Sequence, residues 1–172
     1  EFRRVLFRSE HVETIPVLWA GGGSSAIDRR KFELLGGFDT LYQPFYVEDA
    51  DLSIQAWKRG WKSLLAPTSH VFHAHRGTSR PKFGDEYVNR VIRRNQYLLA
   101  WKTATTWRGV VSHILGLPRA QGSAIMQYGA GAELDVFLSA FFRLPWAIAR
   151  KLATIRSAKV SEVEVLRSEE HT

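Results

Sequence analysis

The chain has 172 residues, a formal net charge of +7 and no cysteine, with 45% hydrophobic and 12% aromatic residues. It is too apolar for a disordered chain, and its length suits about one domain. The absence of cysteine excludes disulfides and thiolate metal sites. No apolar run approaches the roughly 20 residues that cross a bilayer, since the best stretch, residues 136–142, is bounded by Asp135 and Arg143.

The two ends of the chain are related to each other at the level of DNA. The last residues, RSEEHT, can be encoded by AGA TCG GAA GAG CAC ACG, and the reverse complement translates as RVLFRS, which is residues 4–9. A sequencing-library adapter read on both sides of an insert gives this pattern. We therefore expect residues 1–9 and 167–172 to be artefacts, and residues 10–166 to be an internal part of a longer protein.

The first expected elements surround a run of glycines. The segment IPVLWAGGGSSAI, residues 15–27, predicts an apolar strand, a glycine turn that allows close backbone approach, and a second strand of small residues. A short helix should follow, with Asp28 as its N-cap and Gly36-Gly37 as its stop.

Further along the chain, a helix should run from the segment EDADL to about Arg59, before Gly60. WKSLLAP and SHVFHAH then predict two strands. The pattern becomes helical over residues 85–102 and again over about 133–156, where Pro145 should kink the helix. The order is an α/β part followed by an all-helical part.

Three carboxylates crowd the start of the EDADL helix, Glu48, Asp49 and Asp51. One carboxylate suffices to cap a helix, and a second favours the helix dipole. Three in four positions repel one another unless a cation, a proton or a polar ligand lies among them. The excess acid makes this stretch a candidate site, although all three carboxylates capping a solvated helix is the alternative.

Taken in order, these pieces resemble a known enzyme family. RRKF, LGGFD, an aromatic-rich loop, EDADLSIQAWKRGW, HVFHAHRGTS and RRNQYLLAWK are similar to the C-terminal part of the catalytic domain of family 2 glycosyltransferases, over about residues 19–102. The resemblance implies an α/β, Rossmann-like GT-A fold. Residues 10–104 would form the C-terminal part of that catalytic domain, and residues 105–166 a helical C-terminal region.

The resemblance implies an inverting enzyme, which moves a sugar from a nucleotide diphosphate donor to an acceptor hydroxyl. Such an enzyme needs a carboxylate base within hydrogen-bond reach of that hydroxyl. By its position in the ED pair, Asp49 is the base, and Glu48 would orient the acceptor or the loop. Asp51 would contact backbone or donor-side groups at the helix start.

A divalent metal, Mn²⁺ or Mg²⁺, is also implied, because the departing diphosphate develops negative charge. The run at 49–51 spells D-x-D, but the family's metal-binding D-x-D follows an earlier strand, so we expect it upstream of this chain. In related enzymes a downstream His completes the metal shell, and His73 fits best, with His75 as second choice. Otherwise these residues and His70 are ordinary strand-end histidines.

Further substrate contacts are implied by resemblance. Gly22, Gly23 and Ser24 resemble the small-residue segment that lines the donor and acceptor cleft, although a simple tight turn explains them equally well. Arg76, in the basic loop RGTSR, would close on the diphosphate, unless this loop is merely solvated. Trp57 is better explained as a core residue than as a platform for a sugar.

The segment after Leu134 interleaves apolar and basic side chains. This pattern is typical of a helix that lies on an anionic membrane surface, although packing against the catalytic domain is the alternative. We therefore expect a nucleotide-sugar donor, a glycan or lipid-linked acceptor and a peripheral membrane contact. Surface glycan synthesis in the cytoplasm, at the inner face of the cell membrane, fits these partners.

Two other classes of function are open. One is a metal-dependent hydrolase built on His70, His73 and His75, but HAHRGT lacks the acidic ligand expected soon after H-x-H. The other is a basic nucleic-acid-binding module, which would cluster Lys and Arg with exposed aromatics on one face. Here the basic residues are dispersed, so nucleic acid is not an expected partner. Because the donor-binding strands should lie upstream, we expect the chain alone to be inactive.

Overall fold

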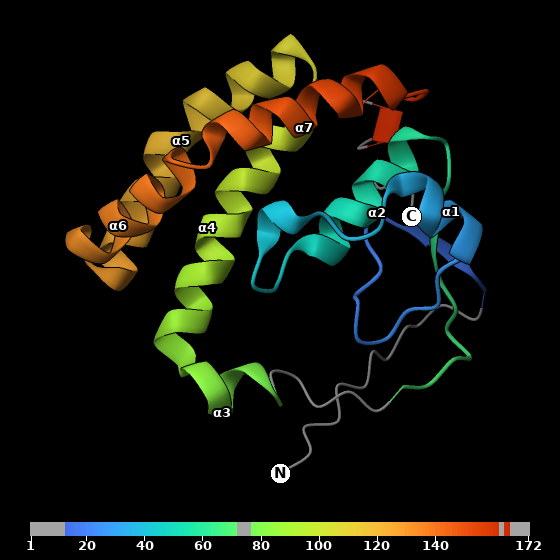
Figure 1. Ribbon diagram of the computed structural model, residues 1–172, viewed down its shortest axis with the longest axis horizontal. Coiled ribbons are helices and arrows are strands. Elements are labelled where there is room, and N and C mark those ends of the chain that lie inside the picture. The colour runs from blue at the N-terminus through green and yellow to red at the C-terminus, as the bar shows by residue number, and fades with distance from the viewer. Residues whose placement is uncertain (1–12, 72–76, 162–163, 166–172) are drawn as a thin grey trace.

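The computed structural model describes residues 13–71, 77–161 and 164–165, so both ends predicted to be artefacts lie outside the described residues. Figure 1 shows a group of long helices on one side and a group of short elements on the other. The elements in chain order are β1 (Ile15–Val17), α1 (Arg29–Leu35), a 3-10 helix (Thr40–Tyr42), α2 (Glu48–Lys58), β2 (Ser63–Leu65), α3 (Ser79–Phe83), α4 (Asp85–Thr103), α5 (Trp107–Tyr128), α6 (Ala130–Phe141) and α7 (Leu144–Ser157).

The described part of the chain is mostly helical, with one small sheet. Strands β1 and β2 pair antiparallel, with Ile15 opposite Leu65 and Val17 opposite Ser63. The second strand predicted after the glycine turn does not form, because an extended segment needs a ladder partner and none lies beside it in the described chain. A parallel Rossmann-like sheet is likewise absent from the described ranges, so the GT-A fold stays a prediction.

The two short helices begin and end as their sequences predict. The Asp28 carboxylate accepts a hydrogen bond from the Lys31 N–H at 3.0 Å, which caps α1, and Gly36 ends this helix with a φ of 85°. Helix α2 begins at Glu48, and its C-cap is Arg59. The helix expected over 85–102 is also confirmed, as α4.

Helix α4 provides the central face of the fold. Five of its six buried residues follow a spacing of three and four, which is the stripe of a helix that faces a core: Val88, Val91, Asn95, Leu98 and Lys102. Helices α6 and α7 pack against it. Leu98 joins Leu41, Tyr42, Ala140 and Ala147 in one buried cluster, so α4 connects the short elements to the C-terminal helices.

The C-terminal region is helical, as expected, but its division differs. The single kinked helix predicted over 133–156 is two helices, α6 and α7, separated at Phe142–Arg143. Pro145 lies in the first turn of α7, where a missing N–H leaves no hydrogen bond unmade. Helix α5 was not predicted as a separate element.

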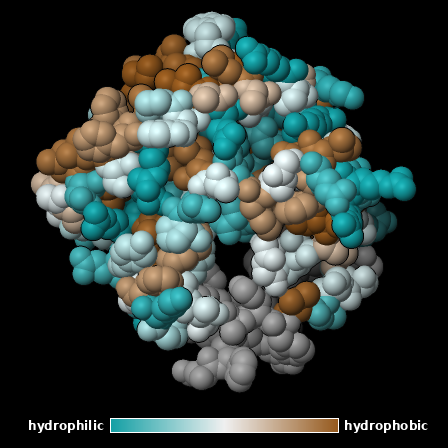
Figure 2. Space-filling model, viewed as in Figure 1, coloured by the Kyte–Doolittle hydropathy of each residue, from teal (hydrophilic) through white to brown (hydrophobic). Residues whose placement is uncertain are grey.

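None of the helices in the described ranges is both long enough and apolar enough to cross a membrane. Figure 2 shows hydrophobic side chains along the upper left of the molecule, over this helical part.

A buried ion cluster joins α2, α4 and α7. The Lys102 Nζ atom lies 2.8 Å from Asp39 Oδ2 and 2.6 Å from Asp51 Oδ2, and Arg150 Nε lies 3.3 Å from Asp39 Oδ1. Burial raises the pKa of Asp39, but the Lys102 ammonium and the Leu41 N–H outweigh it and hold this pKa below its ordinary value. Burial dominates at Asp51 and raises its pKa, against the opposing effect of Lys102.

Replacing this ammonium should destabilise the fold severely. We expect Lys102→Met to lower the free energy of unfolding by about 3–5 kcal/mol at pH 7, because two buried carboxylates lose their shared cation. Asp39 has a lowered pKa, so its contribution to stability is present above pH 3.8 and is lost as the pH falls through its folded-state value. Without the ammonium, Asp39 and Asp51 take up protons at higher pH in the variant. The difference in free energy of unfolding between the two proteins should therefore be smaller in acid than at pH 7.

Urea unfolding at pH 7 and pH 4 measures this effect. Lys62→Met is the matched control, since Lys62 is exposed and its loss should change stability by less than about 0.5 kcal/mol. Equal effects of the two substitutions, or a deficit that does not depend on pH, would contradict the role given to Lys102.

Candidate active site

The structure brings the glycine turn against the acidic start of α2. The Gly22 N–H donates a hydrogen bond to Asp49 Oδ2 at 2.9 Å, across 27 positions of sequence. The Ala50 N–H donates to Asp49 Oδ1 at 2.8 Å. A second hydrogen bond also joins this region to α2, since the Ala20 N–H donates to Ser53 Oγ at 3.1 Å. Two stretches predicted to share a site therefore do meet.

The glycine turn leaves the Asp49 carboxylate accessible. A Cβ atom at Gly22 would lie 3.5 Å from Asp49 Cβ and 3.7 Å from Asp49 Oδ2. Such a methyl group would fit, but a longer side chain there would extend over the carboxylate. Gly23 and Ser24 are exposed on the same turn, which the Ser24 N–H closes by donating to the Gly21 carbonyl at 3.0 Å.

Glu48 has an unusual environment for a carboxylate. It is partly buried, and its Oε2 atom is shielded from solvent without any hydrogen-bond donor in the structure. Burial raises the pKa of Glu48, and the neighbouring Asp49 raises it further, although a backbone hydrogen bond opposes both. A buried acceptor without a donor is costly, so it marks a position where folding alone does not explain the residue.

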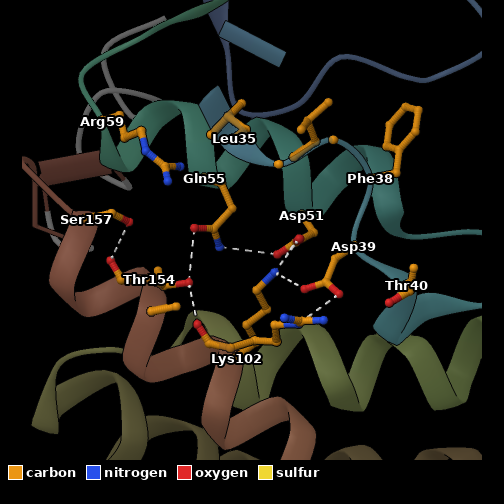
Figure 3. Close-up of a pocket in the computed structure, with 15 residues that line it drawn as sticks. Leu35, Phe38, Asp39, Thr40, Asp51, Gln55, Arg59, Lys102, Thr154 and Ser157 are labelled. Atoms are coloured by element: carbon orange, nitrogen blue, oxygen red, sulfur yellow. Dashed lines mark hydrogen bonds and ion pairs between the residues drawn. The ribbon is translucent and has the colours of Figure 1, made fainter. Parts of the chain in front are cut away.

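Asp51 faces away from Asp49. Residues two apart on a helix point about 200° apart around its axis, and Asp51 is bound to Lys102 with only 2% of its surface exposed. It forms part of the wall of a cavity of about 330 Å³ between α1, α2 and α7, which Figure 3 shows with Asp39, Gln55 and Thr154 around it. Asp51 was predicted to contact backbone or donor-side groups at the helix start, but its carboxylate instead binds the Lys102 ammonium and the Gln55 amide.

The same geometry bears on the D-x-D run at 49–51. A cation held by this run would need both aspartates on one side, but one carboxylate binds the Gly22 N–H and the other binds the Lys102 ammonium. This arrangement agrees with the rejection of Asp49-Ala50-Asp51 as a metal motif.

The loop before α2 is held in a strained conformation. Tyr46 and Val47 both have left-handed backbones, with φ values of 70° and 79°, which non-glycine residues rarely adopt. The Asn95 side-chain amide compensates by sharing its two N–H donors among three carbonyl groups in and just before this loop. Its Nδ2 atom lies 2.7 Å from the oxygen of Tyr42, 3.0 Å from that of Phe45 and 2.9 Å from that of Tyr46. Strain of this kind concentrates at functional sites.

Arg94 completes the support of the loop. Its Nε and Nη2 atoms donate to Asn95 Oδ1 at 3.0 and 2.8 Å, and its Nη2 atom also donates to the Gln43 carbonyl. These contacts orient the amide so that its donors face the loop. Burial lowers the pKa of Arg94 to about 10, and it stays a cation at neutral pH.

Sequence reasoning missed the roles of Asn95 and Lys102. Both lie within RRNQYLLAWK, which contributed to the resemblance but received no site assignment. Their position along the sequence could have revealed these roles. Each is a polar residue on the buried stripe of α4, where neighbours such as Val91 and Leu98 are apolar. Polar groups at core positions require partners, and here the partners are the loop and the two aspartates.

The remaining predicted residues are divided by what the structure describes. His73, His75 and Arg76 lie outside the described residues, and His70 is exposed at the end of a described range. In the described ranges no three His, Asp or Glu side chains are grouped so as to hold a metal ion. Trp57 is a core residue, as predicted, and its Nε1 atom donates to the Val17 carbonyl at 3.0 Å.

Part of the chain is similar to known enzymes. It is 32% identical over 93 residues to polypeptide N-acetylgalactosaminyltransferase 5 of Caenorhabditis elegans, which covers 54% of this chain and 14% of the relative. It is 30% identical over 79 residues to polypeptide N-acetylgalactosaminyltransferase 3 of Drosophila melanogaster, covering 45% and 12%. The mouse polypeptide N-acetylgalactosaminyltransferase 4 is 32% identical over 66 residues, covering 38% and 11%.

By name, these relatives are glycosyltransferases. The chain spans less than a sixth of the length of each of them, between 11% and 14%. No protein-family model matches the chain, and no solved structure matches it.

Loss of the Asn95 amide should release the strained loop. We expect Asn95→Leu to lower the free energy of unfolding by about 2–4 kcal/mol, because three carbonyl groups and Arg94 lose their partner. Amide exchange in the first turn of α2 should become faster. The neighbouring Gln96 is exposed, so Gln96→Leu is the control and should change stability by less than about 0.5 kcal/mol. Unchanged exchange at α2 in the Asn95 variant would show that the loop does not depend on this amide.

Glu48 should oppose folding at neutral pH. Its folded-state pKa is raised, so ionised Glu48 costs stability as the pH rises from 4.5 through the folded value. We expect Glu48→Gln to increase the free energy of unfolding at pH 7, with a gain that disappears towards pH 4. Urea unfolding across this range measures the gain. The exposed Glu33 provides the control, Glu33→Gln, which should show no such gain, and a loss of stability in Glu48→Gln at pH 7 would disprove the assignment.

Proposed function

We propose that the chain is part of an inverting glycosyltransferase that moves a sugar from a nucleotide diphosphate donor to an acceptor hydroxyl in surface glycan synthesis. The observation that carries this proposal is the Asp49 carboxylate, held beside the glycine turn by two backbone N–H groups. The similarity to enzymes named as glycosyltransferases supports the reaction class. The segment quoted for the family resemblance, with the same ED pair, supports the assignment of the base.

Asp49 would act as the general base. An ionised carboxylate has about four acceptor positions, and the Gly22 and Ala50 N–H groups use two of them. A remaining lone pair would accept the proton of the acceptor hydroxyl as its oxygen attacks the anomeric carbon of the donor. The bond from that carbon to the diphosphate breaks, the nucleoside diphosphate leaves with the bonding electrons, and attack opposite the leaving group inverts the configuration.

Glu48 would orient the acceptor beside the base. Its Oε2 atom accepts no hydrogen bond from the protein, so a hydroxyl group of the acceptor sugar would give it a donor. Such a contact would also relieve the cost of shielding this oxygen from water. Gly22, Gly23 and Ser24 would line the same opening with their small side chains.

The proposal also includes a divalent metal, Mn²⁺ or Mg²⁺, which would neutralise charge on the departing diphosphate. His73 would be the ligand from this chain, with His75 as second choice and Arg76 beside the diphosphate; the remaining ligands would come from an upstream D-x-D. The sequence resemblance supports these roles and the GT-A fold. Within the described residues no three His, Asp or Glu side chains are grouped so as to hold a metal ion.

The test is Asp49→Asn in the full-length protein that contains this segment. We expect turnover to fall by about 100-fold or more, because a general base contributes a factor of that order, while donor affinity changes little. The acceptor panel should include glycans, lipid-linked sugars and peptides with Ser or Thr, since the relatives are named for a polypeptide acceptor. NMR of the product reports the anomeric configuration.

Asp135→Asn is the matched control, because Asp135 lies on α6 in an exposed pair with Arg90. It should leave turnover unchanged. Near-normal turnover of Asp49→Asn, or a product that retains the donor's anomeric configuration, would remove Asp49 from the role of base.

A further inference from the structure

Helix α5 presents an apolar stripe to solvent. It has 22 residues, none of which is buried. Its most exposed apolar side chains are large, with Trp107 72%, Leu115 75% and Met126 89% exposed. They recur at helical spacing on one face together with Val111, Ile114 and Ile125. Such a stripe normally faces a protein core, so its exposure calls for a partner.

Helices α6 and α7 extend this exposed apolar area. Phe142 is 72% exposed and Trp146 is 63% exposed, at the junction of the two helices. Figure 2 shows part of the area as brown side chains along the upper left of the molecule. We call the following set the α5–α7 apolar surface: Trp107, Val111, Ile114, Leu115, Ile125, Met126, Leu134, Leu138, Phe141, Phe142 and Trp146.

The charges that accompany this surface are almost all positive. Residues 107–157 contain six Lys or Arg residues and two acidic residues, and one of the six, Arg150, pairs with Asp39. Both acidic side chains contact residues of α4. Glu133 is 3% exposed and accepts a hydrogen bond from the Tyr97 hydroxyl at 2.6 Å, and Asp135 pairs with Arg90. The charge left to act outward is therefore basic, and an anionic partner would be attracted to it.

The basic residues also lie close to the apolar stripe. Arg108 stacks on Trp107, with 5.6 Å from its guanidinium carbon to the ring centroid. Arg119 lies 11 positions further along α5, which places it within about 20° of Arg108 around the helix axis. A helix with apolar side chains on one face and arginines along the edge of that face is suited to the boundary between lipid headgroups and acyl chains.

We propose that the α5–α7 apolar surface docks onto an anionic lipid bilayer, with α5 lying in the plane of the membrane. A lipid surface satisfies both observations, because it buries apolar side chains and attracts basic ones. A second copy of this chain would bring two basic surfaces together, which like charges oppose. The proposal does not depend on the glycosyltransferase assignment.

Flotation of the whole 172-residue chain with vesicles tests the proposal. We expect binding to vesicles that contain phosphatidylglycerol, at least tenfold weaker binding to pure phosphatidylcholine, and a several-fold loss at high salt. The triple variant Trp107→Glu, Leu115→Glu, Met126→Glu should bind at least tenfold more weakly. All three side chains are exposed, and circular dichroism should show an unchanged helical content.

The matched control introduces the same three negative charges elsewhere. Trp19, Leu34 and Leu64 are 57%, 69% and 55% exposed in the other part of the molecule. Their triple replacement by Glu should retain most of the binding. Equal losses in both triple variants would overturn the assignment to this surface.

Three further results would overturn the proposal. One is a chain that does not float with either kind of vesicle. Another is equal binding to anionic and neutral vesicles without a salt effect. The third is light scattering that shows a stable oligomer, converted to a monomer by the α5 substitutions, in a chain that never binds vesicles. That result would identify a second copy as the partner of the surface.

Discussion

The ammonium group of Lys102 joins the segments that carry the family-like motifs. It lies between Asp39, from LGGFD, and Asp51, from EDADL, and all three side chains are largely buried. Two carboxylates this close would repel one another in a medium of low dielectric constant. The position of α2 against α4 therefore depends on this cation, and Arg150 of α7 adds a second positive charge beside Asp39.

Other polar contacts attach α2 to its surroundings along its whole length. At its C-terminal end, Lys58 Nζ donates to the Thr103 carbonyl at 2.7 Å and to Thr105 Oγ1 at 2.8 Å. In the middle, the Thr154 hydroxyl donates to Gln55 Oε1 at 3.1 Å, which ties α2 to α7. At its N-terminal end, Asn95 holds the preceding loop. Helix α4 and its neighbours thus hold α2, and with it the Asp49 carboxylate, through contacts away from the opening beside the glycine turn.

Local sequence predicted the elements whose boundaries are set locally. Asp28 and Gly36 define α1 through a cap and a left-handed residue, and both signals involve only near neighbours. The strand expected after the glycine turn failed because it required a partner elsewhere. Helix α5 was missed because glycines and Pro118 interrupt its pattern, although tertiary packing against α6 accommodates them.

The candidate site divides in the same way. Family resemblance assigned Gly22 and Asp49 to the same cleft without predicting a contact between them, and no spacing along the chain implies the hydrogen bond that joins them. The separation of Asp49 from Asp51 follows from helical geometry, yet the resemblance implied that Asp51 contacts backbone or donor-side groups at the helix start, not the Lys102 ammonium. Asn95 and Lys102 act on segments 49–63 positions away, so only the fold reveals what their buried polar groups bind. The assignments of His73 and Arg76 remain predictions.

Two residues of α2 that are only two positions apart have different surroundings: Asp51 is in the core and Asp49 is at the opening beside the glycine turn. This arrangement limits how the segment can evolve. Inserting one residue between Asp49 and Asp51 would rotate one carboxylate by about 100° relative to the other. Either the contact with Gly22 or the pairing with Lys102 would then be lost, because each partner belongs to a separate part of the fold. Point substitutions are tolerable along this helix wherever partners permit, but changes in its length are not, so homologous chains that keep both contacts should align through EDADL without gaps.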